Sequence, residues 1–143
     1  MRVLARSESL FAGGRDELTF RGVGQMEKTE YGHRLRYTAQ NEADGSGVAS
    51  ELRLETSLHR AVVITESRDG GYGLLLDPRA ETVTQIAGGD GGTLTLRVQT
   101  QEVGWHLPRK GPGTVTLRYT LLLGTQQMSA LHLELTLTKE END

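Results

Sequence analysis

Residues 113–121 read Gly-Thr-Val-Thr-Leu-Arg-Tyr-Thr-Leu, a stretch in which every second side chain is apolar. Val115, Leu117, Tyr119 and Leu121 fall on one face, and three threonines with an arginine fall on the other. A period of two residues with one apolar face is typical of a half-buried β-strand. The β-branched residues strengthen this interpretation, because threonine and valine fit a pleated sheet. We therefore predict a strand here.

The same alternation recurs along the chain. Residues 130–138 place four leucines on one face, and residues 93–100 alternate Leu and Val with polar side chains. Residues 2–6 could add one more strand, and residues 47–58 fit a helix almost as well as a strand. Weaker apolar pairs predict further strands at Leu18 and Phe20, Leu35 and Tyr37, Leu52 and Leu54, Val62 and Ile64, Leu74 and Leu76, and Val83 and Ile86.

The segments between these strands are turns rich in glycine, aspartate and proline. They lie at residues 44–47, 69–71, 77–78, 88–92 and 111–113. Nine or ten short strands are too many for one open sheet of this size, so we expect an all-β fold closed into a barrel. Short connections favour an antiparallel up-and-down order over a Greek key, which needs a long crossover. Two glycines in the first long strand, Gly22 and Gly24, predict a bend or bulge.

Length and composition limit the possible functions. The chain has 143 residues, a formal net charge of −3 and no cysteine. We expect one domain over residues 1–143, with its core at about 16–139. The missing thiols exclude a disulfide scaffold and a cysteine nucleophile, and the acidic balance argues against nucleic-acid and anionic-membrane partners. No apolar run has the length of a signal peptide or a membrane span, so we expect a cytoplasmic protein.

Five features occur in order along the chain: the strand with Leu18 and Phe20, the Arg68-Asp69-Gly70 turn, and the strands at residues 92–100, 113–121 and 129–135. In this order of features the chain resembles the YwiB-like bacterial proteins of unknown function, which are small calycin-like β-barrels. The resemblance runs from about residue 16 to residue 139. The family often carries a Tyr-x-Thr-Pro segment before the middle turn, where this chain has residues 84–87, Thr-Gln-Ile-Ala. The resemblance implies a calycin-like barrel and supplies no catalytic residue.

A barrel interior is the first candidate site, because other calycin-type barrels bind apolar ligands there. Counting by two along residues 62–64 places Glu66 and Arg68 on the inward face near one end. A carboxylate and a guanidinium there could hold the head group of an amphipathic molecule. Gln85 is expected at the same end, and Tyr37 is expected nearby. The alternative interpretation is a solvated charge pair at a strand end.

Trp105 is the only tryptophan, and a basic stretch follows it. We expect its ring to close one mouth of the barrel; the alternatives are an anchor for a partner or a platform for a nucleic-acid base. Glu102 is expected on the inward face at the end opposite Glu66, too far away for a glycosidase carboxylate pair. The four histidines lack metal-ligand spacing and no catalytic or phosphate-binding motif occurs, so neither metal nor cofactor is predicted.

These observations favour a non-enzymatic cytoplasmic barrel that binds a small amphipathic molecule in its interior. The second hypothesis is a protein-interaction module that uses an outer sheet face or a strand edge. Outer faces rich in threonine and arginine offer no large apolar patch, which counts against it. An enzyme is the third hypothesis and would need clustered carboxylates with shifted pKa values. The lining of the interior decides among them. The ligand-binding residues expected from the sequence are Glu66, Arg68, Gln85, Tyr37 and Trp105.

Overall fold

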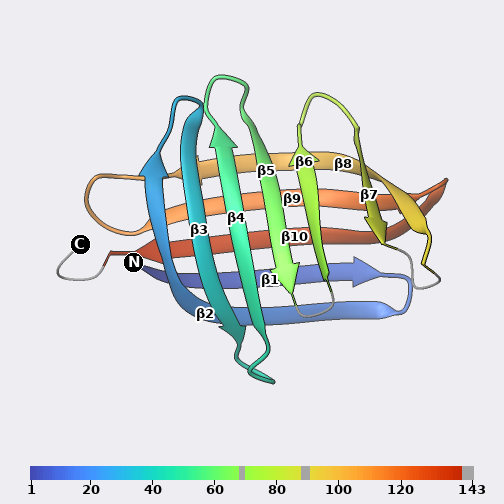
Figure 1. Cartoon of the computed structure of the whole chain (residues 1–143), viewed down its shortest axis with the longest axis horizontal. Coiled ribbons are helices and arrows are strands. Elements are labelled where there is room, and N and C mark those ends of the chain that lie inside the picture. The colour runs from blue at the N-terminus through green and yellow to red at the C-terminus, as the bar shows by residue number, and fades with distance from the viewer. Residues whose placement is uncertain (68–69, 88–90, 140–143) are drawn as a thin grey trace.

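A computed structural model describes residues 1–67, 70–87 and 91–139, and these residues form β-strands and turns (Figure 1). In the part of the chain so described, there is no helix able to span a membrane. Residues 47–55 form a strand rather than a helix. Ten strands follow one another: β1 (Arg2–Phe11), β2 (Gly14–Lys28), β3 (Gly32–Asn41), β4 (Gly47–Glu55), β5 (Arg60–Ser67), β6 (Gly70–Leu76), β7 (Thr82–Ala87), β8 (Thr93–His106), β9 (Gly113–Leu123) and β10 (Gln126–Thr138).

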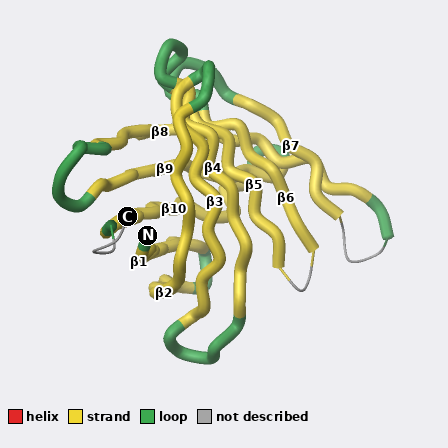
Figure 2. Tube along the Cα trace, turned by 60° about the vertical axis from the view of Figure 1, so that its left-hand side comes forward, coloured by secondary structure: helices red, strands yellow, loops and turns green. Residues whose placement is uncertain are grey.

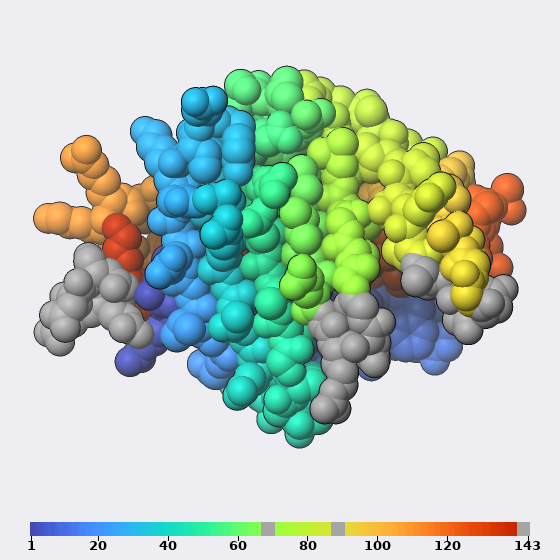
Figure 3. Space-filling model, viewed as in Figure 1, coloured from blue at the N-terminus to red at the C-terminus, as the bar shows by residue number. Residues whose placement is uncertain are grey.

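The strands form one sheet in the order β6-β5-β4-β3-β2-β1-β10-β9-β8-β7. Every hydrogen-bonded pair is antiparallel, which confirms the predicted up-and-down order. In Figure 1, β8, β9, β10 and β1 cross behind β3–β7, and in Figure 2 the two sets wrap around a common interior. The space-filling view in Figure 3 shows β3–β6 side by side on the near face. The fold is a nearly closed calycin-like barrel.

Strand β2 belongs to both sets and turns the sheet between them. Its residues 14–23 pair with β1, and its residues 20–28 pair with β3. Gly22 lies where the two pairings overlap, and a Cβ atom there would sit 1.8 Å from the carbonyl oxygen of Thr38. Only a glycine lets the two backbones approach this closely. The close approach of β2 to β3 therefore requires a glycine at this position, where a bend was predicted.

The interior near the two chain termini is filled by aliphatic side chains. Leu35 lies opposite Leu52, Leu52 opposite Val63, and Val63 opposite Leu74, so one apolar row crosses four strands. Each of these side chains is buried. Burying a leucine or valine side chain contributes about 1.5–3 kcal/mol to folding. The facing wall supplies Val3, Val115, Leu117, Leu135 and Leu137 to the same core.

The barrel closes between β6 and β7, the two ends of the sheet, through side chains. The Thr82 hydroxyl donates a hydrogen bond to the Leu75 carbonyl oxygen at 2.5 Å. The Thr84 hydroxyl donates to the Gly73 carbonyl oxygen at 2.6 Å. The nine other strand contacts are backbone ladders, whereas no such ladder joins the described residues of β6 and β7. Two threonine hydroxyls thus replace the tenth ladder.

The double variant Thr82→Val and Thr84→Val should weaken this seam without changing the shape of either side chain. We expect the free energy of unfolding to fall by about 1–3 kcal/mol, because two hydrogen bonds are lost and two carbonyls lose their partners. Urea unfolding measures that change, and amide hydrogen exchange should accelerate in β6 and β7. Thr114→Val, at an exposed outer position of β9, is the control. If amide hydrogen exchange in β6 and β7 were unchanged in the double variant, the two threonine hydroxyls would not be what holds this seam.

Gly22→Ala should destabilise the barrel, because the new methyl group collides with the backbone of β3. Overpacking of this kind costs about 1–3 kcal/mol. Gly104→Ala is the matched control, since a Cβ atom on that glycine of β8 meets nothing within 4 Å. We expect the control to stay within about 0.5 kcal/mol of the wild type. Equal urea midpoints for the two variants would show that β2 does not need its glycine.

Candidate functional site

A row of hydroxyl-bearing side chains crosses the inner wall midway along the barrel. The register places Tyr37 opposite Ser50, Ser50 opposite Thr65, and Thr65 opposite Tyr72. This row is the next one after the aliphatic row of the packed end. On the facing wall, a second pair of hydroxyl-bearing residues from β8 and β9 lies directly opposite each other. We call the six side chains the hydroxyl belt: Tyr37, Ser50, Thr65, Tyr72, Thr100 and Tyr119.

Two phenol groups of the belt, those of Tyr37 and Tyr119, have raised pKa values. Burial raises the pKa of Tyr37, a hydrogen bond with Ser50 partly offsets that rise, and the Tyr72 phenol adds to it. Burial also raises the pKa of Tyr119, and Tyr72 and Tyr37 raise it further. The three phenols therefore lie close enough to influence one another. Near neutral pH, the Tyr37 and Tyr119 phenols provide hydroxyl donors and acceptors without carrying a charge.

At one end of the barrel, inward-facing apolar side chains reach solvent, beside the inward-facing Ser7 and Ser9 of β1. Four inward-facing side chains at the strand ends are 37–43% exposed: Phe11, Leu18, Leu94 and Leu123. Below them, Phe20, Leu121, Leu131 and Leu133 are partly buried against the core. In Figure 1 the hairpin turns β1–β2 and β9–β10 lie together at the right, opposite the N-terminal end of β1. We call this open end, rimmed by Phe11, Leu18, Leu94 and Leu123, the mouth.

Trp105 lies at the opposite, packed end. It sits opposite Val115 on the inward face of β8 and packs against the core. The His59 ring, from the β4–β5 turn, stacks on it with ring centroids 5.5 Å apart and planes 23° apart. His59 has a positive φ of 50°, a conformation that few non-glycine residues adopt. The indole thus covers the closed end of the barrel, away from the mouth.

Glu66 does not point into the barrel, so its expected placement was wrong. It lies opposite Ala49, and its side chain is exposed on the outer face. Residues 61–64, Ala-Val-Val-Ile, are aliphatic on both faces, so the alternation could not show which set is buried. The structure buries Ala61 and Val63. Arg68, the expected partner of Glu66, lies outside the described residues.

Gln85 is also on the outer face, and its expected inward placement was wrong. Its two neighbours along β7, Thr84 and Ile86, lie opposite the inward-facing Leu96 and Leu94. Because successive side chains of a strand point to opposite faces, Gln85 faces outward. The apolar Val83 suggested the opposite parity, but this side chain is 63% exposed. Tyr37 and Trp105 face inward, at different levels of the barrel. The structure therefore does not bring the expected constellation together.

Glu102 is turned outward by a bulge in β8. The register shifts between Thr100 and Glu102, so Thr100 stays opposite Tyr119 while Glu102 faces Arg118. An extra residue in one strand reverses the alternation beyond it. This reversal is why counting from Val98 placed Glu102 inside. Among the described residues, no cluster of His, Asp and Glu side chains is arranged to hold a metal ion.

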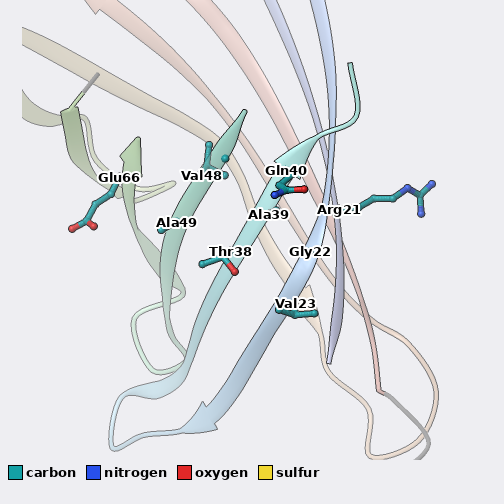
Figure 4. Close-up of a pocket in the computed structure, with 10 residues that line it drawn as sticks. Arg21, Gly22, Val23, Thr38, Ala39, Gln40, Val48, Ala49 and Glu66 are labelled. Atoms are coloured by element: carbon teal, nitrogen blue, oxygen red, sulfur yellow. The ribbon is translucent and has the colours of Figure 1, made fainter. Parts of the chain in front are cut away.

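Glu66 lines a groove on the outer face instead (Figure 4). Val23, Thr38, Ala49 and Glu66 are consecutive cross-strand neighbours and form its floor. Two adjoining hollows of about 580 and 810 Å³ share these four residues. In Figure 4, Glu66 and Arg21 extend outward from opposite sides. The second hollow is also lined by Tyr37 and Ser50 of the hydroxyl belt.

One wall of the groove carries an ion triad. Glu51 accepts hydrogen bonds from Arg36 at 2.9 Å and from Arg53 at 2.7 Å. Partial burial acts to raise the pKa of Glu51, but the two guanidinium groups outweigh it and hold that pKa below its usual value. Two cations share one anion here, so this wall keeps a positive charge. The arrangement suits a polar surface better than a pocket for an apolar molecule.

The buried tyrosines make stability fall at high pH. Both Tyr37 and Tyr119 have raised pKa values in the folded state, whereas unfolded tyrosines ionise near pH 10. Their contribution is complete below that pH and is lost as pH rises, by up to about 1.4 kcal/mol per pH unit for each tyrosine. Urea midpoints between pH 8 and 11 should show the loss, and the double variant Tyr37→Phe, Tyr119→Phe should lose less. Tyr31→Phe, in the β2–β3 turn, is the control and should lose as much stability as the wild type. If the wild type lost no more stability than the double variant, this explanation would be contradicted.

Comparison with solved structures agrees with this architecture. The crystal structure of ywiB protein from Bacillus subtilis superposes with a TM-score of 0.75, covering 97% of this chain and 90% of that chain at 16% sequence identity. No protein-family model matches the chain, and no curated protein sequence matches it. At this identity the likeness concerns the fold. The chain therefore has the barrel fold of the Bacillus subtilis ywiB protein, as the sequence resemblance implied.

Proposed function

We propose that the protein is a non-catalytic barrel that binds a small amphipathic molecule in the open half of its interior. The observation that supports this proposal is the contrast between the two ends. Inward-facing leucines and valines near the termini are almost fully buried, whereas the four side chains of the mouth are 37–43% exposed. A fold that needed its inner wall only for packing would gain by covering the mouth as well.

The chemistry of the open half matches such a ligand. Leu121 is the next inward residue from Tyr119 toward the mouth, Leu131 lies opposite Tyr119, and Leu133 lies opposite Leu117. An aliphatic or aromatic group that covers them contributes about 25 cal/mol for each Å² removed from water. The belt provides hydrogen-bonding groups at the deeper end. An apolar pocket with a few polar groups at one side is the usual form of a small-molecule site.

The neutral fluorescent probe N-phenyl-1-naphthylamine tests this proposal. It should bind the wild-type protein with an increase in emission, because the probe leaves water for an apolar wall. Leu18→Gln should raise its Kd about tenfold, since a polar side chain then occupies the mouth. Val23→Gln is the matched control, because it lies on the same strand but faces the outer groove.

The two variants separate the interior from the outer face. An unchanged Kd for Leu18→Gln together with a raised Kd for Val23→Gln would place the probe in the groove and contradict binding in the interior. Circular dichroism and the urea midpoint of each variant establish that both remain folded. No binding of the probe by the wild-type protein would also contradict the proposal.

A further inference from the structure

The hydroxyl belt adjoins the aliphatic row of Leu35, Leu52, Val63 and Leu74. Toward the mouth, the inner wall carries leucines together with the inward-facing Ser7 and Ser9. Within the belt, Tyr37, Ser50 and Tyr119 are buried, whereas Tyr72 is 41% exposed. We propose that the belt binds an uncharged hydrogen-bonding group of the ligand, such as a hydroxyl, a carbonyl or an amide. This inference rests on the proposed function and specifies the ligand class that the site accepts.

The belt lacks a countercharge for an ion. Its six side chains are tyrosines, serine and threonines, which donate and accept hydrogen bonds without carrying a charge near neutral pH. Glu66 and Glu102, once expected inside, are on the outer face. Asp16 lies opposite Ser9 on the inward side of β2, but it is exposed at the rim of the mouth. A buried ion without a partner is strongly disfavoured.

The raised pKa values of Tyr37 and Tyr119 show that this environment disfavours negative charge. Burial is the largest cause that keeps the Tyr37 and Tyr119 phenols protonated. A ligand carboxylate at the same depth would meet the same loss of solvation. A hydroxyl or carbonyl would meet a smaller loss, which hydrogen bonds from the belt could offset. The belt thus distinguishes neutral head groups from ionised ones.

The member of the belt on β8, Thr100, carries a buried hydroxyl. The Thr100 Oγ1 atom is buried and has no hydrogen-bond partner among the described residues. The bulge in β8 keeps this side chain inward, opposite Tyr119. Buried polar atoms are nearly always hydrogen-bonded, and this hydroxyl keeps a donor and an acceptor that the described residues do not use. An oxygen or N–H group of the ligand at this level would supply the missing bond.

Three compounds with the same eight-carbon chain test the inference. Octan-1-ol, octanoate and octylammonium are titrated at pH 7 against N-phenyl-1-naphthylamine bound to the protein. We expect octan-1-ol to displace the probe at a concentration at least tenfold lower than either ion. The equal chain lengths hold the apolar contribution constant, so the difference reports the head group.

Single hydroxyl deletions then locate the head group. Tyr119→Phe and Tyr37→Phe keep the ring and remove the hydroxyl, so each should weaken octan-1-ol by about three- to tenfold. The affinity of the probe should stay within about twofold, because the apolar wall is unchanged. Tyr31→Phe, outside the barrel interior, is the control and should change neither affinity.

The outcomes distinguish this inference from the proposed function. Displacement by octanoate or octylammonium at the same or a lower concentration than octan-1-ol would overturn the neutral head-group site while leaving interior binding in place. The same holds if both phenylalanine variants bind octan-1-ol as the wild type does. Failure of the wild-type protein to bind the probe or any octyl compound would overturn both.

Discussion

Closure of a single antiparallel sheet on itself is the constraint on which the rest of this structure depends. Each strand alternates its side chains between the two faces, so closure sends every second residue into one shared interior. The strand register then decides which inward residues meet at the same level. Leu35, Leu52, Val63 and Leu74 meet in one layer, and the hydroxyl belt forms the next. The strand register thus places inward residues from neighbouring strands opposite one another, so the interior consists of successive layers of side chains.

Two departures from regular strand geometry shape this interior. Gly22 lets β2 pair with β1 and β3 over overlapping residues, which turns the sheet by bringing three backbones together. The bulge after Thr100 reverses the alternation in β8, so the carboxylate of Glu102 leaves the interior. The first departure makes closure possible, and the second keeps the facing wall free of charge. The glycine at position 22 and the bulge in β8 are both features of the backbone, and each changes which side chains face the interior or how closely strands pack.

The long alternating strands could be predicted from the sequence, because one face of each is apolar over many residues. The patterns of β8, β9 and β10 and the up-and-down order belong to this group. β5 and β7 could not be oriented, because residues 61–64 are aliphatic on both faces and Val83 is apolar yet exposed. A short strand with apolar residues of both parities gives no information about which face is buried. The expected placement of Glu66 and Gln85 depended on these two strands.

The hydroxyl belt was missed because its members come from strands far apart in the sequence. Only the register brings them together, and Tyr37 alone had been singled out. A local signal was nevertheless present, since each belt residue lies two positions from a buried aliphatic one on the same strand. The pairs are Leu35 and Tyr37, Ser50 and Leu52, Val63 and Thr65, Tyr72 and Leu74, Val98 and Thr100, and Leu117 and Tyr119. A hydroxyl that repeatedly follows or precedes a core residue indicates a shared polar layer.

The seam between β6 and β7 also bears on how the molecule avoids its own copies. These strands are the two ends of the sheet, and an uncovered strand edge is a template for pairing with another chain. The hydroxyls of Thr82 and Thr84 hold the edge of β7 against the edge of β6. Each strand edge therefore covers the other and keeps it from pairing with another chain. Loosening this contact would expose two complementary edges at once. Intermolecular strand pairing, with chains exchanging or extending their sheets, would then compete with reclosure and would grow with protein concentration.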